Sequence, residues 1–219
     1  MDLIEFIRKS IEQNEKEARE LLLRERQKKI ACLTRSSNIP KRYRNATLEN
    51  FNPKYNPRAL EIAKKFVMNF PEGKGLLFAG PVGTGKTHLA AAIANALIDK
   101  LYSVYFGNVV DIMAFIKSTY NEDSEISERE AINIMTDKVD LFIIDDLGKE
   151  NTKDYTSAML YQLINKVYEN EKPIIITTNF NSVELTGKLG ERGQAIVSRI
   201  AEMCESVIFE GEDWRLCKK

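Results

Sequence analysis

A glycine-rich segment, GPVGTGKTHL, spans residues 80–89 and combines residue types that bind phosphate. Its spacing of Gly80, four residues, and then Gly85, Lys86 and Thr87 fits the pattern G-x-x-x-x-G-K-S/T. Glycines leave backbone N–H groups open to an anion, a lysine adds a positive charge, and a threonine hydroxyl is a ligand for Mg²⁺. The segment therefore predicts a site for the β- and γ-phosphates of a nucleotide, the alternative being a turn that binds nothing.

Within this segment, we expect Lys86 to reach the phosphates and Thr87 to bind the metal. A helix over residues 87–99 is expected to direct its positive N-terminus at the same phosphates. The residues expected to contact the nucleotide are Gly80, Pro81, Val82, Gly83, Thr84, Gly85, Lys86, Thr87 and His88. We interpret His88, the single histidine, as structural, because no metal cluster or nucleophile accompanies it.

Two adjacent acids, Asp145 and Asp146, follow the apolar run 141–144 and fit a Walker B element. In that element the first acid holds the Mg²⁺ shell and the second orients the water that attacks the γ-phosphate. Asn179 follows another apolar run, PIIITT, and its amide is expected to bond both the water and the γ-phosphate. The alternatives are solvated or helix-capping acids, and a helix cap by Asn179 or Asn181.

Five short apolar runs predict the strands that position these residues. They are GLLFAG, SVYFGN, DLFIID, PIIITTN and ESVIFEG, and helical segments separate them. Such runs are typical of a parallel sheet buried on both faces, which indicates an α/β fold with helices on both sides. Ligands bind at the carboxyl ends of such strands, so the phosphate loop, the two acids and Asn179 are expected at one edge. Asn56 is expected to cap a helix that begins at Pro57.

The composition is that of an ordinary globular chain of 219 residues, 43% of them hydrophobic. Lysine and arginine together number 32, as do aspartate and glutamate, which excludes a globally basic nucleic-acid binder but not a local patch. No apolar run approaches a membrane span of about 18 residues, and the first residues lack a secretory pattern, so we expect a cytoplasmic protein. Cys32, Cys204 and Cys217 show neither zinc nor disulfide spacing.

The N-terminal residues 1–36 are expected to form a separate module before a domain over residues 37–219. Residues 2 to about 30 are rich in charge and carry a seam at three- and four-residue steps, which predicts a helix standing apart from the core. It is either a solvated helix or a docking arm for a partner protein. The basic stretch 24–44 contains a linker-like SSNIP and is either a solvated face or a contact for a nucleic-acid backbone.

The motifs GPVGTGKTHLA, FIIDDLG and IITTN, followed by IVSRIAEM and GEDWR, resemble the AAA+ ATPases of the DnaC/DnaI/IstB group. The resemblance covers roughly residues 38–217. It implies a P-loop NTPase fold (the AAA+ core), with a five-stranded parallel sheet flanked by helices, behind the expected N-terminal helix. Most AAA+ proteins continue into a helical lid, whereas we expect no C-terminal lid domain here, because the sequence ends soon after its fifth predicted strand. The resemblance also implies ATP and Mg²⁺ as cofactors. Arg199 matches an arginine finger that reaches a neighbouring subunit's γ-phosphate, and Arg215 matches the arginine of the group's terminal motif.

Two departures from the group affect the expectation. Asp146 stands where many AAA+ proteins have glutamate, and its shorter side chain predicts slow turnover. The lone Cys32 cannot supply the zinc-binding N-terminal domain of DnaI-type loaders, which leaves the partner open.

The leading hypothesis is an ATP-dependent helicase loader. Its N-terminal helix would grip a hexameric replicative helicase, while the ATPase domain self-associates through Arg199 in trans and senses single-stranded DNA. Residues 109–135 resemble an extra helical element of initiators and loaders, in which Phe115, Lys117 and Tyr120 are candidates for DNA contact. The alternatives are an IstB-like transposition helper and a nucleotide-dependent scaffold with little hydrolysis. A small-molecule kinase is disfavoured by the pair of acids.

Overall fold

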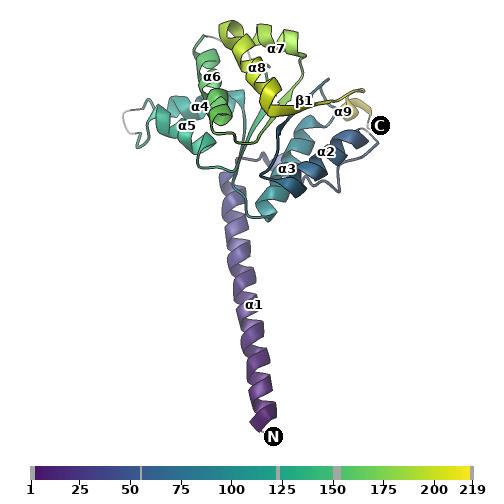
Figure 1. Cartoon of the computed structure of the whole chain (residues 1–219), viewed down its shortest axis with the longest axis vertical. Helices are drawn as coiled ribbons and strands as arrows, with labels where there is room; N and C mark the ends of the chain where they lie inside the picture. The colour runs from purple at the N-terminus through teal and green to yellow at the C-terminus, as the bar shows by residue number, and fades with distance from the viewer. Residues whose placement is uncertain (1–2, 55, 122–123, 150–153, 218–219) are drawn as a thin grey trace.

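A central sheet of five parallel strands, in the order β2-β3-β4-β1-β5, forms the middle of the molecule (Figure 1). The strands are β1 (Gly75–Ala79), β2 (Val104–Asn108), β3 (Leu141–Leu147), β4 (Ile174–Thr178) and β5 (Cys204–Ile208). Each falls within or overlaps one of the five predicted runs, so the predicted α/β fold with a five-stranded parallel sheet is confirmed. The strand β4 lies between β1 and β3, which places a strand between the phosphate loop and the two acids.

The computed structural model describes residues 3–54, 56–121, 124–149 and 154–217, with side chains described from residue 18 to residue 216 within these ranges. The helices in this part of the chain are α1 (Leu3–Ser36), α2 (Pro57–Asn69), α3 (Lys86–Asp99), α4 (Val109–Ser118), α5 (Glu128–Thr136), α6 (Asp154–Glu169), α7 (Ser182–Lys188), α8 (Gly193–Met203) and α9 (Trp214–Cys217). This part of the chain also contains two short 3₁₀ helices, Lys41–Tyr43 and Gly190–Arg192.

The strands are buried on both faces because successive residues belong to two different cores. Ile143 and Ile175 pack with α2 and α3 on one face. Ile144 and Ile176 pack with α4, α5, α6 and α8 on the other. Continuous apolar runs are therefore required in place of an alternating pattern. The expected start of α2 is also found, since Asn56 Oδ1 accepts a hydrogen bond of 2.9 Å from the Ala59 N–H.

Helix α1 projects from the sheet domain as a long rod (Figure 1). It continues to Ser36, beyond the predicted end near residue 30, because its last turns are attached to the domain. Ile30 and Leu33 pack half-buried against the core, and Arg26 Nη2 donates to the Asp99 carbonyl at 3.1 Å. The side chains of residues 18–29 are exposed, as expected for a helix that stands apart.

The SSNIP stretch is more firmly held than its linker-like composition predicts. Ser37 is fully buried and its carbonyl accepts a hydrogen bond of 2.8 Å from the Phe106 N–H of β2. Ile39 is buried in the core on the α2 and α3 side. The joint between α1 and the domain is thus a packed segment.

Among the described helices, none combines the length and the apolar character that crossing a lipid bilayer requires.

Candidate active site

The phosphate loop, residues 80–87, joins the carboxyl end of β1 to the start of α3. Gly80, Gly83 and Gly85 have φ angles of 144°, 80° and 96°, a region that side-chain-bearing residues rarely adopt. A Cβ on Gly83 would overlap the Asp213 carboxylate, and one on Gly85 would crowd Phe51 and Trp214. The backbone of the loop is therefore held in shape by glycine at these positions.

Lys86 is the charge at the centre of this loop, only 4% exposed. Its Nζ donates hydrogen bonds to the Gly80 carbonyl at 2.7 Å and to the Pro81 carbonyl at 2.6 Å. Burial lowers the pKa of Lys86 to about 8, an effect that the charges of Asp146 and Asp145 oppose. A buried ammonium group thus lies among backbone carbonyls of the loop, with two acids close enough to affect its pKa.

Asp145 meets the phosphate loop through Thr87. Its Oδ1 accepts hydrogen bonds from Thr87 Oγ1 at 3.0 Å and from Thr177 Oγ1 of β4 at 2.6 Å. Burial raises the pKa of Asp145, as does the charge of Asp146, while the Thr177 and Thr87 hydrogen bonds act against this rise. The structure therefore brings together the two residues expected to hold Mg²⁺.

Asp146 lies in a strained part of β3. Its φ is 57°, and the register of β3 with β4 shifts between Ile144 and Leu147. Its carboxylate forms an ion pair of 3.3 Å with Lys149 and lines a small hollow with Asn108 and Lys149. The side chain is 30% exposed, so the second acid is reachable by water.

Asn179 follows directly after β4 and is half-buried. No hydrogen bond to its side-chain amide is found in the part of the chain that the structure describes. The cap of α7 is Asn181, whose Oδ1 accepts from the Val183 and Glu184 N–H groups. Since the neighbouring asparagine makes the cap, the amide of Asn179 is left for another partner.

Arg199 is not brought to the phosphate loop of its own chain. It lies on α8, where Nε donates to Asn165 Oδ1 at 2.8 Å and Nη2 donates to the Tyr161 hydroxyl at 3.0 Å. Its guanidinium also lies over the Tyr161 and Tyr168 rings, 4.9 and 5.7 Å from their centres. Action on a neighbouring subunit would require it to exchange these contacts.

Arg215 lies beside the phosphate loop, since the preceding residue, Trp214, donates its backbone N–H to the Gly83 carbonyl at 3.4 Å. The Arg215 side chain is exposed.

His88 bonds Asn50 Oδ1 at 2.9 Å and packs against Phe51 at 5.9 Å between ring centres. Burial lowers its pKa. These contacts attach the segment before α2 to α3, in keeping with a structural role.

The other loop residues differ in exposure. Val82 is 51% exposed, while Thr84 is buried and donates its hydroxyl to the Pro81 carbonyl at 2.8 Å. The contacts of Phe51, Asp213 and Trp214 with the loop were not predicted. These residues come from segments far apart in sequence. The likeness of GEDWR to a terminal motif was a signal for the last two, and IPKRYRNATLENF, which ends at Phe51, resembles the segment that runs past the adenine in the same group.

A model of the IstB-like ATP binding proteins matches residues 12–219, nearly the whole chain. The chain belongs to this family.

Among curated relatives, the replicative helicase loader DnaC of Escherichia coli (strain K12) is 34% identical over 159 residues. The match covers 71% of the IstB-like chain and 64% of DnaC, so somewhat less than two thirds of that relative is spanned. A crystal structure of the DnaC helicase loader superposes with a TM-score of 0.67 at 34% identity, covering 78% of this chain and all of that one. The replication initiator DnaA, solved with AMPPCP and single-stranded DNA, gives a TM-score of 0.65 at 26% identity, covering 80% of this chain and 52% of that one. The predicted P-loop fold and the predicted family are confirmed.

The residues present fit ATP and Mg²⁺ by their chemistry. A loop of glycines in positive φ precedes a helix N-terminus, which suits an anion. The Thr87 hydroxyl and the Asp145 carboxylate converge within 3.0 Å, and both are hard oxygen ligands of the kind that Mg²⁺ prefers.

Proposed function

We propose that this IstB-like protein is an ATP-dependent helicase loader. It binds and hydrolyses ATP with Mg²⁺, and it loads a hexameric replicative helicase onto single-stranded DNA during DNA replication. The observation that carries the proposal is the convergence of Thr87 with Asp145 beside the buried Lys86, in a chain similar to DnaC.

In the proposed reaction, the loop amides and Lys86 bind the β- and γ-phosphates, exchanging the Gly80 and Pro81 carbonyls for phosphate oxygens. Thr87 and Asp145 would hold the Mg²⁺, which would neutralise the charge that develops on the transferred phosphoryl group. Asp146 orients and polarises the water, which Asn179 also bonds. Arg199 of a neighbouring subunit stabilises the transition state, so the active form is an oligomer.

Replacing Asp146 with asparagine tests whether the protein hydrolyses ATP. We expect the turnover number to fall about 100-fold with the affinity for ATP kept, because general-base assistance contributes roughly 10²–10⁴-fold and the short aspartate holds water less well than glutamate. The measurement is steady-state phosphate release beside calorimetric binding of a non-hydrolysable analogue. Lys149→Gln serves as the control, because it removes the partner of Asp146 and leaves the acid in place.

A wild-type protein whose slow turnover is unchanged by Asp146→Asn would instead be a nucleotide-dependent scaffold, contrary to the proposal.

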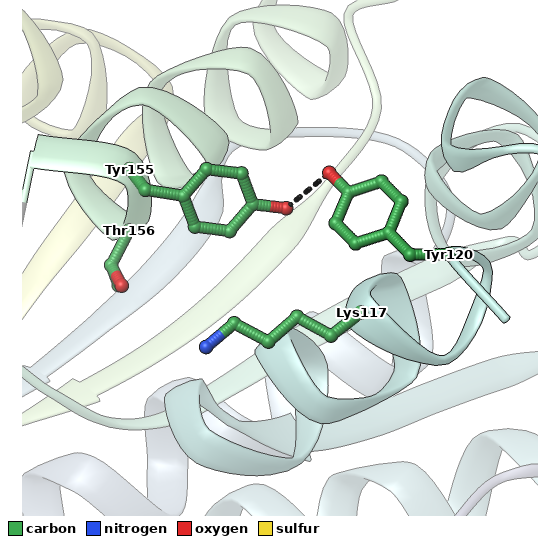
Figure 2. A pocket seen from close by; sticks show the side chains of 4 residues that line it. All are labelled: Lys117, Tyr120, Tyr155 and Thr156. Atoms are coloured by element: carbon green, nitrogen blue, oxygen red, sulfur yellow. Dashed lines mark hydrogen bonds between the residues drawn. The ribbon is translucent and has the colours of Figure 1, made fainter.

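A hollow between α4 and α6 is the proposed contact for single-stranded DNA. It has a volume of about 380 Å³ and is lined by Lys117, Tyr120, Tyr155 and Thr156. Figure 2 shows the two tyrosine rings meeting through their hydroxyls, 2.8 Å apart, with Lys117 extended beneath them. The Lys117 Nζ lies 5.9 Å from the centre of the Tyr155 ring, and Tyr120 is 57% exposed.

An exposed aromatic ring beside a lysine suits the two parts of a nucleotide, because bases stack on rings and phosphates attract cations. Lys117 and Tyr120 were predicted candidates, and Tyr155 joins them across the hollow. Phe115, the third candidate, is half-buried and packs against the core on this side of the sheet, with its ring centre 6.5 Å from that of Tyr105.

Replacing Tyr120 with alanine is expected to weaken binding of single-stranded DNA about tenfold, because stacking on one ring contributes roughly 1–3 kcal/mol per base. Lys117→Ala should also reduce the dependence of affinity on salt, since one phosphate contact is lost. Fluorescence anisotropy with a labelled oligonucleotide measures both effects. Tyr102→Phe is a control, because Tyr102 packs half-buried against the core on the other face of the sheet. Tighter binding of duplex than of single-stranded DNA would contradict the loader and favour an IstB-like transposition helper.

The exposed part of α1 is the proposed docking arm for the helicase. Leu21, Leu22 and Leu23 are 59%, 64% and 58% exposed, so three large apolar side chains face solvent in consecutive positions. Each leucine buried in an interface contributes about 1.5–3 kcal/mol. Ile30 and Leu33, which pack α1 against the core, are not part of the proposed contact with the helicase.

Changing Leu21, Leu22 and Leu23 together to serine is expected to reduce capture of a purified hexameric replicative helicase at least about 100-fold, on the basis of those burial energies. Binding of ATP should not change. Substitution in the full chain avoids a truncation through residue 36, which would also remove the core contacts of Ile30 and Leu33. Met68→Ser is the control, since Met68 is an apolar side chain, 72% exposed, on α2. Capture that survives in the triple variant would refute the docking arm.

A further inference from the structure

Thr177 lies opposite an irregularity in the strand that carries both acids. Ile144 of β3 pairs with Ile176 of β4, and Leu147 pairs with Thr178. Two residues, Asp145 and Asp146, therefore face the single residue Thr177. This is the arrangement of a β-bulge, in which one strand has an extra residue and its hydrogen-bond ladder is interrupted.

The Thr177 hydroxyl bonds both residues of this bulge. It donates to Asp145 Oδ1 at 2.6 Å and accepts from the backbone N–H of Asp146 at 2.9 Å. Asp146 has a φ of 57° and lies where the regular pairing of β3 with β4 is interrupted. Because Thr177 is fully buried, no water can replace its hydroxyl without a rearrangement of the sheet.

Two hydroxyls thus hold one oxygen of the Asp145 carboxylate. Thr87 donates to Oδ1 from the phosphate loop and Thr177 donates to it from β4. No hydrogen bond to Oδ2 is found from the described residues. Since none of their buried polar side-chain atoms lacks a partner, Oδ2 is an atom that solvent can reach. Oδ2 is accordingly the oxygen that remains available to a metal or to its water shell.

We propose that Thr177 is a positioning residue for the Mg²⁺ and ATP chemistry of this site: its hydroxyl fixes the side chain of the first acid and the backbone of the second. The inference rests on the proposed ATPase function. Removing a group that hydrogen-bonds a metal ligand typically lowers metal affinity or activity 10–100-fold.

Thr178 is the control that separates a positioning role from a purely structural one. It is also buried, on the same strand, but its hydroxyl donates to the Leu147 carbonyl at 2.8 Å and contacts neither acid. Loss of the Thr178 hydroxyl should cost the fold a buried hydrogen bond with no specific effect on the metal.

The test compares Thr177→Val, Thr177→Ser and Thr178→Val in the full chain. Binding of a fluorescent, non-hydrolysable ATP analogue is measured against Mg²⁺ concentration, beside turnover and hydrogen exchange of the Asp146 amide. For Thr177→Val we expect unchanged binding in EDTA, a Mg²⁺ midpoint raised about tenfold, a turnover number lowered about tenfold and faster exchange. Thr177→Ser keeps the hydroxyl and should stay within about threefold of wild type, and Thr178→Val should keep the wild-type Mg²⁺ midpoint.

An unchanged Mg²⁺ midpoint and exchange rate in Thr177→Val would overturn the inference, as would a serine variant as defective as the valine one. If Thr177→Val does not fold, Thr177→Ser and Thr177→Ala, which differ by the hydroxyl alone, make the same comparison. The Mg²⁺ midpoint does not depend on turnover. A wild-type protein without hydrolysis would thus refute the ATPase proposal, while a shifted midpoint in the variant would still support the role of Thr177.

Discussion

Replacing Lys86 with alanine is expected to lower the affinity for ATP at least about 100-fold and to abolish detectable hydrolysis. Hydrogen bonds to charged groups contribute roughly 1.5–3 kcal/mol each, and Lys86 Nζ now makes two of them to backbone carbonyls that phosphate oxygens would replace. About 1.4 kcal/mol corresponds to a tenfold change in affinity, so loss of both bonds exceeds 100-fold. Calorimetric titration with a non-hydrolysable ATP analogue and Mg²⁺ gives the affinity directly.

The thermal stability of the nucleotide-free variant should be unchanged or higher. Burial lowers the pKa of Lys86 to about 8, so the fold pays for holding this ammonium group away from water, and alanine removes that cost. Lys100→Ala is the matched control: Lys100 follows the other end of α3, and its Nζ also donates to a backbone carbonyl, that of Val67. Undiminished ATP binding by Lys86→Ala, with the control also unaffected, would refute the phosphate site.

Replacing Arg199 with alanine is expected to lower the turnover number about 1,000-fold while the affinity for ATP stays near that of wild type. An arginine finger contributes roughly 10³–10⁵-fold, because it stabilises charge that develops only in the transition state. Its guanidinium is held against α6 by Asn165 and Tyr161, so it must exchange these contacts to reach a neighbouring subunit. Asn165→Ala controls for damage to this cluster, since it keeps the arginine and removes one of its contacts.

Mixing the two inactive variants tests whether Arg199 acts on a neighbouring subunit. In a mixture, Lys86→Ala subunits supply an intact Arg199 to Arg199→Ala subunits, whose phosphate loops are intact. We expect the mixture to regain activity at such interfaces, although neither variant is active alone. No recovery at concentrations where the wild type self-associates would place the action of Arg199 elsewhere.

The sheet could be predicted because each strand is a short apolar run that must be buried on both faces. The phosphate loop and the acids could be predicted because their residue types and spacing follow from the chemistry of phosphate and Mg²⁺. The strand order places Thr87 and Asp145 at one edge, as the rule for parallel sheets requires.

Other features depend on contacts between distant segments and left no local pattern. Tyr155 of α6 meets Tyr120, which follows α4, across 35 residues of sequence, and Asp213 meets Gly83 across 130. The segment at Ser37 has the composition of a linker, yet its carbonyl pairs with β2. Polar composition predicts a turn or linker, whereas burial is decided by the neighbours that the fold supplies.

A crystal structure of the protein with Mg²⁺ and a non-hydrolysable ATP analogue tests the proposed site most directly. We expect the β- and γ-phosphates against the backbone N–H groups of residues 83–87, with the metal beside Thr87 and the carboxylate of Asp145. An analogue bound away from this loop, or Mg²⁺ held by residues other than these two, would contradict the proposed chemistry.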